Sequence, residues 1–129
     1  MTKSIVLDAS ALLALFNDEP GALVVENSLS HSFVSAVNAA EVITELYIKL
    51  AIPVEQAKEM VATLVNKIVP FDLTLAAEAA RLRKETKFLG LSLGDRACLA
   101  LAKALRLPVY TADKAWGKLD FPCEIILIR

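Results

Sequence analysis

The fold is decided near the start of the chain, where residues 4–16 read SIVLDASALLALF. Residues 4–7 form a short apolar run with β-branched members, which predicts a buried strand. Asp8 follows directly, and residues 9–16 then read as a helix that ends at a turn over residues 18–21. A buried strand that leads at once into a helix is the repeating unit of α/β proteins.

The same alternation of short apolar runs and longer helical segments continues along the chain. The further predicted strands are residues 33–34, 68–69, 108–110 and 125–128. The further predicted helices are residues 22–29, 37–50, 53–67, 73–87 and 92–106. Strands that are apolar on both faces belong to parallel sheets with helices on each side. We therefore expect a single domain over residues 1–129, a three-layer α/β/α sandwich with a mainly parallel sheet of about five strands.

The balance of charges limits the kinds of partner. The chain has 14 basic and 15 acidic residues, a net charge of -1, which argues against a protein that holds polyanions through its overall charge. The charges are unevenly spread, because residues 1–64 hold three basic and eight acidic residues, whereas residues 65–129 hold eleven and seven. A near-neutral total is therefore compatible with a basic surface beside an acidic pocket.

The apolar content, 56% of residues, does not predict a membrane protein. The apolar runs are much shorter than the roughly 20 residues that a membrane-spanning helix needs. Asp8 interrupts the apolar start, and no small-residue cleavage site follows, so the start does not match a signal peptide. We expect no membrane association and a cytoplasmic location.

Four carboxylates are the candidate chemical groups. Asp8 follows the first predicted strand, and Asp113 comes shortly after the strand over residues 108–110. Ligands of open parallel sheets bind outside the carboxyl ends of the strands, which is where these two residues would lie. Glu41 and Asp95 fall in the first turns of two predicted helices and could join them.

Each of these carboxylates also has an ordinary structural interpretation, and for Glu41 it is a side chain that simply faces water. Asp8 is suited to cap the helix that follows it, and Asp113 is suited to cap a short helix over residues 114–118. Ser92 and Asp95 have the spacing of a capping box, in which each residue bonds the backbone of the other.

Glu41 has no evident local partner, because the residue at i+4 is the like-charged Glu45. If it lies with the three aspartates in one cleft, their charges repel unless a cation neutralises them. Mg²⁺ and Mn²⁺ prefer oxygen ligands and suit such a site. Asp72 also follows a strand, but we expect it only to cap the helix over residues 73–87.

Four stretches of the sequence resemble the motifs of PIN-domain proteins in the family's order. They are VLDASALLA at residues 6–14, NAAEV at 38–42, LSLGDRACLALA at 91–102 and VYTADKAW at 109–116. Together they span most of the chain, and its length is similar to that of the VapC-type toxins of toxin–antitoxin systems.

The resemblance implies a Mg²⁺- or Mn²⁺-dependent endoribonuclease. Its implied catalytic and metal-binding residues are Asp8, Glu41, Asp95 and Asp113. Its implied supporting residues, which orient carboxylates, water or substrate, are Ser10, Asn38 and Thr111. The implied partners are an RNA substrate, a cognate VapB-type antitoxin and a second copy of the chain in a homodimer.

Basic residues in the second half of the chain are candidate RNA contacts. Arg83, Lys84 and Lys87 share one face of a predicted helix, and Arg96 is near them in sequence. They could bind phosphates, or they could form an ordinary solvated face, since Glu85 lies among them.

Two other readings of the chain stay open. In the first, the PIN-like fold is catalytically silent and binds a partner through apolar residues of the first two helices, which are Leu12, Leu13, Leu15, Phe16, Leu23 and Val24. In the second, the chain is a phospho-receiver domain, but Asp8 is followed by Ala9 and Ser10 rather than by the second acid that such a site needs.

Overall fold

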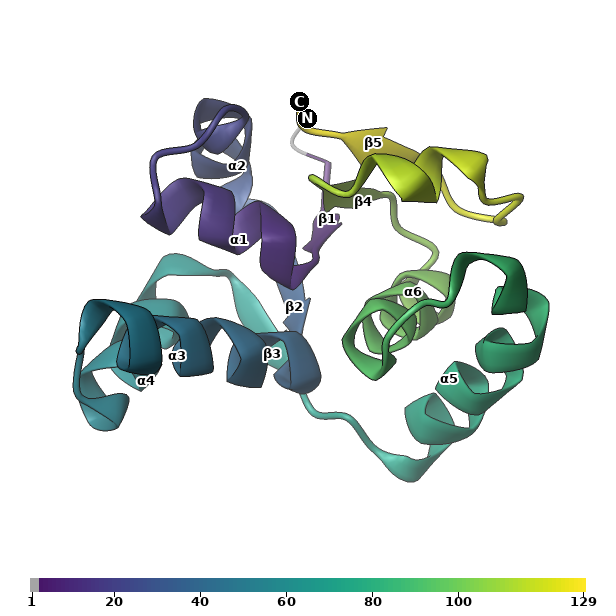
Figure 1. Ribbon diagram of the computed structural model, residues 1–129, viewed down its shortest axis with the longest axis horizontal. Coiled ribbons are helices and arrows are strands. Elements are labelled where there is room, and N and C mark those ends of the chain that lie inside the picture. Colours follow the sequence, from purple (N-terminus) through teal and green to yellow (C-terminus); the bar gives the residue numbers. More distant parts are fainter. Residues whose placement is uncertain (1–2) are drawn as a thin grey trace.

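The computed structural model describes residues 3–129 and contains five short strands and six α-helices (Figure 1). The strands are β1 (Ile5–Leu7), β2 (Ser32–Ser35), β3 (Lys67–Val69), β4 (Val109–Thr111) and β5 (Ile125–Leu127). The α-helices are α1 (Ala9–Phe16), α2 (Ala22–Ser28), α3 (Ala36–Leu50), α4 (Val54–Leu64), α5 (Leu73–Glu85) and α6 (Leu93–Leu105). Three short 3₁₀ segments complete the chain: η1 (Leu29–His31), η2 (Lys87–Leu89) and η3 (Lys114–Lys118).

All strand pairs in the sheet are parallel, and their order is β3-β2-β1-β4-β5. The expected α/β class and the parallel five-stranded sheet are confirmed. The chain builds β2 and β3 on one side of β1 and then crosses to build β4 and β5 on the other. Such a switch point opens a crevice at the carboxyl ends of the two flanking strands, which here are β1 and β4.

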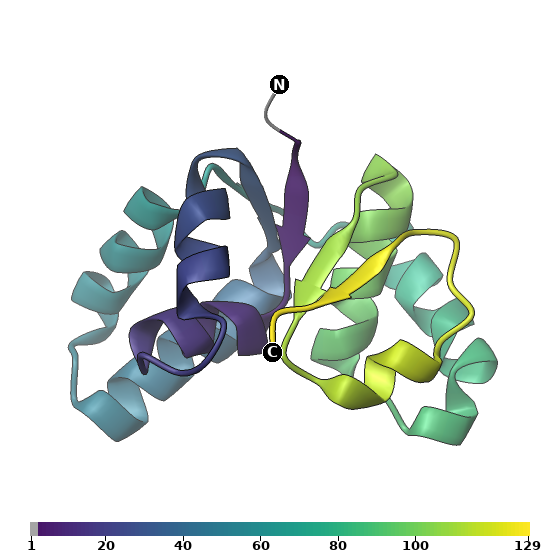
Figure 2. The ribbon, with the colours of Figure 1, turned by 90° about the horizontal axis from the view of Figure 1, so that it is seen from above.

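Side chains of each strand alternate between two cores, one on each face of the sheet. Ile5 and Leu7 of β1 belong to the core formed with α1, α2, α3 and α4, whereas Val6 belongs to the core formed with α5 and α6. Figure 2 shows the two sets of helices on opposite sides of the central strands. This alternation produces the three-layer arrangement that the sequence predicts.

The helices predicted over residues 53–67 and 73–87 both end earlier in the structure, at Leu64 and Glu85. The helix predicted over residues 53–67 ends at Leu64, because Val65 is extended and Lys67 already pairs in the edge strand β3. Asp72 caps α5 as expected, its Oδ1 accepting a hydrogen bond from the Leu75 amide at 2.9 Å.

Within residues 3–129, no helix is long and apolar enough to cross a membrane.

The apolar residues of the first two helices are mostly core. Leu12 is fully buried, and the other large side chains of α1 are partly buried against the same core. Only Leu23 and Val24 in α2 are exposed, to 67% and 40%. The apolar surface expected for these helices is therefore small, because Leu12 is buried and Leu13, Leu15 and Phe16 are partly buried.

Candidate metal centre

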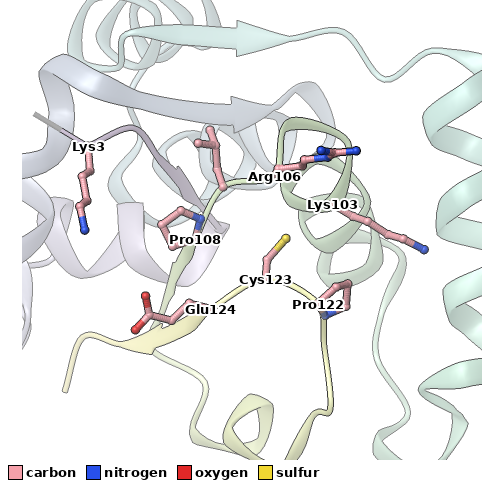
Figure 3. A pocket seen from close by; sticks show the side chains of 8 residues that line it. Lys3, Lys103, Arg106, Pro108, Pro122, Cys123 and Glu124 are labelled. Atoms are coloured by element: carbon pink, nitrogen blue, oxygen red, sulfur yellow. The ribbon is translucent and has the colours of Figure 1, made fainter.

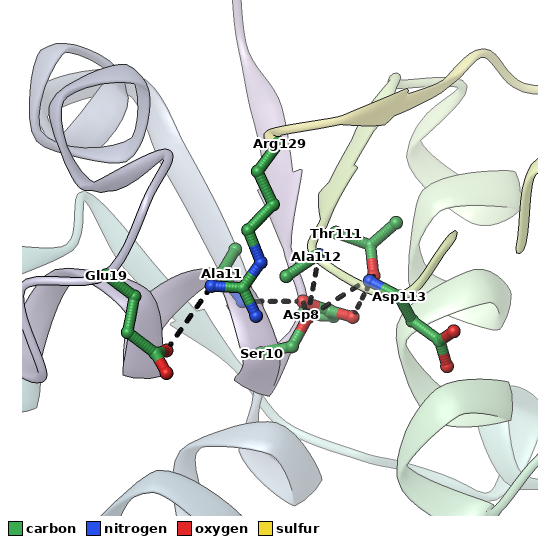
Figure 4. Close-up of polar contacts among 8 residues, drawn as sticks. All are labelled: Asp8, Ser10, Ala11, Glu19, Thr111, Ala112, Asp113 and Arg129. Carbon is green, nitrogen blue, oxygen red and sulfur yellow. Dashed lines mark hydrogen bonds and ion pairs between the residues drawn. The ribbon is translucent and has the colours of Figure 1, made fainter. Parts of the chain in front are cut away.

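Asp8 lies at the carboxyl end of β1 and is held by three hydrogen bonds (Figure 4). Its Oδ1 accepts from Ser10 Oγ at 2.7 Å and from the Ala11 amide at 2.8 Å, which makes Asp8 the cap of α1. Its Oδ2 accepts from Thr111 Oγ1 at 2.6 Å, although Thr111 is 103 residues further along the chain. The capping interpretation of Asp8 is thus correct, and the same carboxylate also joins β1 to β4.

The Asp8 carboxylate carries a negative charge that nearby groups compensate poorly. The side chain is only 3% exposed, and burial raises its pKa to about 6 even though the bonds from Thr111, Ser10 and Ala11 act in the opposite direction. Within residues 3–129, no ion pair involves Asp8. Arg129, drawn beside it in Figure 4, pairs with Glu19 at 3.5 Å instead. A buried acid without a cationic partner suits a bound cation.

Asp95 occupies the first turn of α6 and forms the predicted capping box. Its Oδ2 accepts from the Ser92 amide at 3.0 Å, and its own amide donates to Ser92 Oγ at 3.1 Å. Its charge nevertheless acts on Asp8, since it contributes to the raised pKa of that residue. Asp95 is therefore both a structural cap and a neighbour of the Asp8 carboxylate.

Glu41 reaches across the carboxyl edge of the sheet from α3 to α6. Asn38, one turn earlier in α3, donates from Nδ2 to Glu41 Oε1 at 2.8 Å and to the Gly94 carbonyl at 3.0 Å. The Glu41 carboxylate occupies the space where a side chain at position 94 would begin. The sequence pointed to Glu41 and Asn38, whereas the part played by Gly94 becomes visible only when the two helices are packed.

Burial raises the pKa of the Cys98 thiol in α6, and the charges of Asp8, Asp95 and Glu41 raise it further. These three acids follow β1, lie in α6 and lie in α3, respectively.

Asp113 is placed differently from the other three carboxylates. Its Oδ1 accepts from the Ala115 amide at 3.0 Å and so caps η3, which is the short helix expected over residues 114–118. Its amide donates to Thr111 Oγ1 at 3.1 Å, which ties its backbone to the Asp8 network. As placed in residues 3–129, no three acidic, histidine or cysteine side chains are close enough to hold a metal ion.

The donors still fit a hard divalent cation by their chemistry. All four acids offer oxygen, which Mg²⁺ and Mn²⁺ prefer. The Oδ1 atom of Asn38 adds a further oxygen, because it is buried and accepts no hydrogen bond from any described residue. A buried acceptor without a donor is rare in folded proteins and marks a place for a ligand or an ordered water.

Ser10 and Thr111 form the support for Asp8. Ser10 Oγ donates to Asp8 and accepts from the Ala112 amide at 2.9 Å, and it lies 3.3 Å from Thr111 Oγ1. Thr111 is fully buried. These hydroxyls hold the Asp8 carboxylate in one orientation, and a role of the two residues in binding or catalysis stays a prediction.

The candidate RNA contacts fall into two groups. Arg83, Lys84 and Lys87 are exposed at the end of α5 and in η2. Arg96 is half-buried, and its Nη1 donates to the Ala79 carbonyl at 3.1 Å, so it joins α6 to α5. Phe88, beside Lys87, is also exposed, to 68%.

Two hollows lie on different edges of the sheet. A groove of about 460 Å³ runs beside Glu41 between α1 and α3 and is lined by Ala9, Leu13, Val37, Ala40, Glu41, Thr44 and Glu45. A larger hollow of about 650 Å³ lies at the opposite edge, near the amino ends of β1, β4 and β5, where Figure 3 shows Lys3, Pro108 and Glu124. Of the four candidate acids, only Glu41 lines the smaller groove.

Comparison with known proteins places the fold in a family. Residues 5–122 match the PIN domain family. No curated protein matches the sequence.

Several solved structures share the fold. A toxin–antitoxin complex from Klebsiella pneumoniae contains a chain with 22% identity and a TM-score of 0.76, over 98% of both chains. DNA-bound VapBC from Salmonella typhimurium has 17% identity and a TM-score of 0.73, over 98% of this chain and 99% of that one. VapC20 from Mycobacterium tuberculosis, described as a sarcin–ricin loop cleaving toxin, has 18% identity and a TM-score of 0.74, over 92% and 96%.

These likenesses cover nearly the whole chain, and at such low identity they establish the fold. The match to the family covers far more than half of the sequence and includes all four motif stretches. The protein therefore belongs to the PIN-domain family.

Proposed function

We propose that the protein is a metal-dependent endoribonuclease and acts as the toxin of a toxin–antitoxin pair. The observation that carries this proposal is the Asp8 carboxylate, which is buried at the switch point of the sheet without a cationic partner. A divalent cation bound there would offset the electrostatic cost of the buried Asp8 charge, to which the charge of Asp95 adds.

Asp8, Glu41, Asp95 and Asp113 would hold Mg²⁺ or Mn²⁺. A bound divalent ion would supply Lewis acidity toward a phosphodiester and a water molecule beside it. Ser10 and Thr111 fix the orientation of Asp8, and Asn38 fixes that of Glu41. Asp113 would become a ligand by rotating its carboxylate away from the Ala115 amide, which it caps at the start of η3. The side chain is exposed, which leaves it room to rotate.

We further propose partners of the kind that the structural neighbours suggest. Two of the neighbours described above were solved in toxin–antitoxin complexes. A VapB-type antitoxin would suit the groove beside Glu41 and the exposed Leu23 and Val24, and a homodimer is the expected assembly. The RNA targets of such a toxin place its action in the cytoplasm.

The test of the proposal is cleavage of RNA by the purified, metal-free protein after metal is added back. We expect cleavage in Mn²⁺ or Mg²⁺ and less than about 1% of that rate in excess EDTA, because the carboxylates alone do not activate water or stabilise charge on the phosphate. Sequencing of the RNA ends identifies the cleaved site. Equal cleavage in EDTA would contradict the metal-dependent mechanism.

A second candidate function is a catalytically silent binding module with the same fold. It is favoured by the observation that Asp8, Asp95 and Asp113 are all occupied as helix caps. In that case, the cellular effect of the protein would survive substitution of Asp8 and Asp113 by asparagine. The nuclease proposal requires both variants to be inactive.

The exposed cations of α5 and η2 provide the next prediction. The triple variant Arg83→Ala/Lys84→Ala/Lys87→Ala should bind single-stranded RNA more weakly, and the slope of log affinity against log salt should fall by about 2, since each phosphate contact contributes roughly 0.7. Binding is measured in the Asp8→Asn background, which we expect to leave the RNA intact.

The matched control for this prediction is Lys49→Ala/Lys58→Ala, which removes exposed cations from α3 and α4 on the other face of the sheet. The control should leave the salt slope unchanged. If the triple variant and the control lower the salt slope of RNA binding equally, RNA has no preference for the α5 face.

A further inference from the structure

The packing of Glu41 against Gly94 explains why α6 has a glycine in its first turn. A Cβ atom at position 94 would overlap both carboxylate oxygens of Glu41. Gly94 does not have the positive φ that would make glycine necessary for the backbone, unlike Gly21 and Gly90. The missing side chain, rather than the backbone conformation, is therefore what this position requires.

Glycine at this position has an energetic cost. Inside a helix, glycine is about 1 kcal/mol less favourable than alanine. The capping box would tolerate alanine at position 94, because it involves only the side chains and backbone amides of Ser92 and Asp95. Nothing in α6 itself favours glycine. The contact that favours it comes from Glu41, on a helix that covers the other face of the sheet.

Asn38 fixes the carboxylate in this place. Its side chain is 1% exposed, and its Nδ2 donates to both Glu41 Oε1 and the Gly94 carbonyl. The opposite orientation of the amide would set its oxygen against these two acceptors, so only one orientation is compatible with the contacts. Glu41 is itself exposed, and its orientation therefore depends on the Asn38 bond and on the space at Gly94.

We propose that Gly94 and Asn38 are positioning residues that hold the Glu41 carboxylate at the carboxyl edge of the sheet, where it can contribute to cation binding. The role in cation binding rests on the proposed metal-dependent function. The displacement itself does not: a methyl group at position 94 should displace the Glu41 carboxylate while the fold remains intact. The displacement is easy because the overlapping atoms are the far end of a flexible, exposed side chain.

The test is Gly94→Ala compared with Gly117→Ala. Gly117 is the matched control, because a Cβ there meets only Leu127 Cδ1 at an ordinary 3.8 Å. Gly94→Ala should melt at or above the temperature of the wild type, bind Mn²⁺ at least about tenfold more weakly by calorimetry, and cleave RNA correspondingly less. Gly117→Ala should keep the wild-type Mn²⁺ affinity.

A double-variant cycle separates displacement of Glu41 from a general effect on the site. In the Glu41→Ala background, Gly94→Ala should cause no further loss of Mn²⁺ affinity, since there is no carboxylate left to displace. An equal loss in both backgrounds would show that Gly94 acts by another route and would overturn the proposal.

A metal-free measurement keeps the two proposals distinguishable. The ¹³C resonance of the Glu41 carboxyl group should move in Gly94→Ala and stay in place in Gly117→Ala. An unmoved resonance would overturn the positioning proposal and leave the nuclease proposal untouched. The resonance could also move in Gly94→Ala while the wild type neither binds Mn²⁺ nor cleaves RNA. That combination would contradict the proposed function, and with it the proposal that positioning of Glu41 serves cation binding.

Discussion

Replacing Asp8 by asparagine is expected to abolish RNA cleavage and, in the same protein, to increase the free energy of unfolding at neutral pH. The activity should fall by more than about 100-fold, because the loss of a direct metal ligand exceeds the 10- to 100-fold effects of groups that only support ligands. Asparagine retains the shape of the side chain and can still accept the bonds from Ser10 and the Ala11 amide.

The gain in stability follows from the pKa of Asp8, which burial raises from 3.8 to about 6. The folded protein binds this proton more tightly than the unfolded chain, so the contribution of Asp8 to stability falls as pH increases from about 4 to about 6 and stays low above that. The ionised group costs roughly 2–3 kcal/mol at pH 7. Asp8→Asn removes that cost at pH 7 and changes little at pH 4.

Urea unfolding of metal-free protein at both pH values measures this effect. The variant should be the more stable protein at pH 7, and adding Mn²⁺ should stabilise only the wild type, because a ligand stabilises a protein in proportion to its binding. A variant that is less stable than the wild type at pH 7 would show that the Asp8 charge is well compensated. A variant that still cleaves RNA would refute the role of Asp8 as a ligand.

Trp116→Ala is expected to cause the largest loss of stability, about 3–5 kcal/mol, since it removes a large buried aromatic side chain and leaves a cavity. Trp116 is fully buried in the core on the α5–α6 side of the sheet and anchors η3. Its amide donates to the Asp113 carbonyl at 3.1 Å. We therefore expect the carboxylate of Asp113 to lose its fixed position as well.

The control is Trp116→Phe, which keeps most of the apolar volume. The indole Nε1 of Trp116 has no acceptor among the described residues, so phenylalanine sacrifices no hydrogen bond and should cost much less than alanine. Both are measured by urea unfolding of the metal-free protein. A loss below about 1 kcal/mol for Trp116→Ala would mean that η3 is not a firm part of the core.

Much of the architecture follows from local patterns. Short apolar runs such as Ile5–Leu7 are too short for helices and too apolar for an exposed face, so a covered parallel sheet is their natural arrangement. The caps at Asp8, Asp72, Ser92 and Asp113 depend on residue type and spacing within a few positions. They were predicted as structural interpretations, and all of them occur.

Features that depend on packing between distant elements were not predictable in the same way. Local sequence does not say on which side of β1 the later strands add, and so it does not say that Thr111 meets Asp8. An aromatic residue such as Trp116 is readily predicted to pack, but its complete burial depends on how η3 docks onto the sheet. The space at Gly94 exists only because α3 and α6 meet. The metal-binding roles of the four acids stay predictions.

The bond between Thr111 and Asp8 has a consequence for the order of events during synthesis. Asp8 leaves the ribosome among the first residues, but its partner is made 103 residues later. A nascent or truncated chain that lacks β4 keeps the Ser10 hydroxyl but lacks the Thr111 hydroxyl and the far wall of the crevice. If the protein cleaves RNA, we expect no activity from the growing chain until translation has passed position 113, where the last of the four proposed ligands lies.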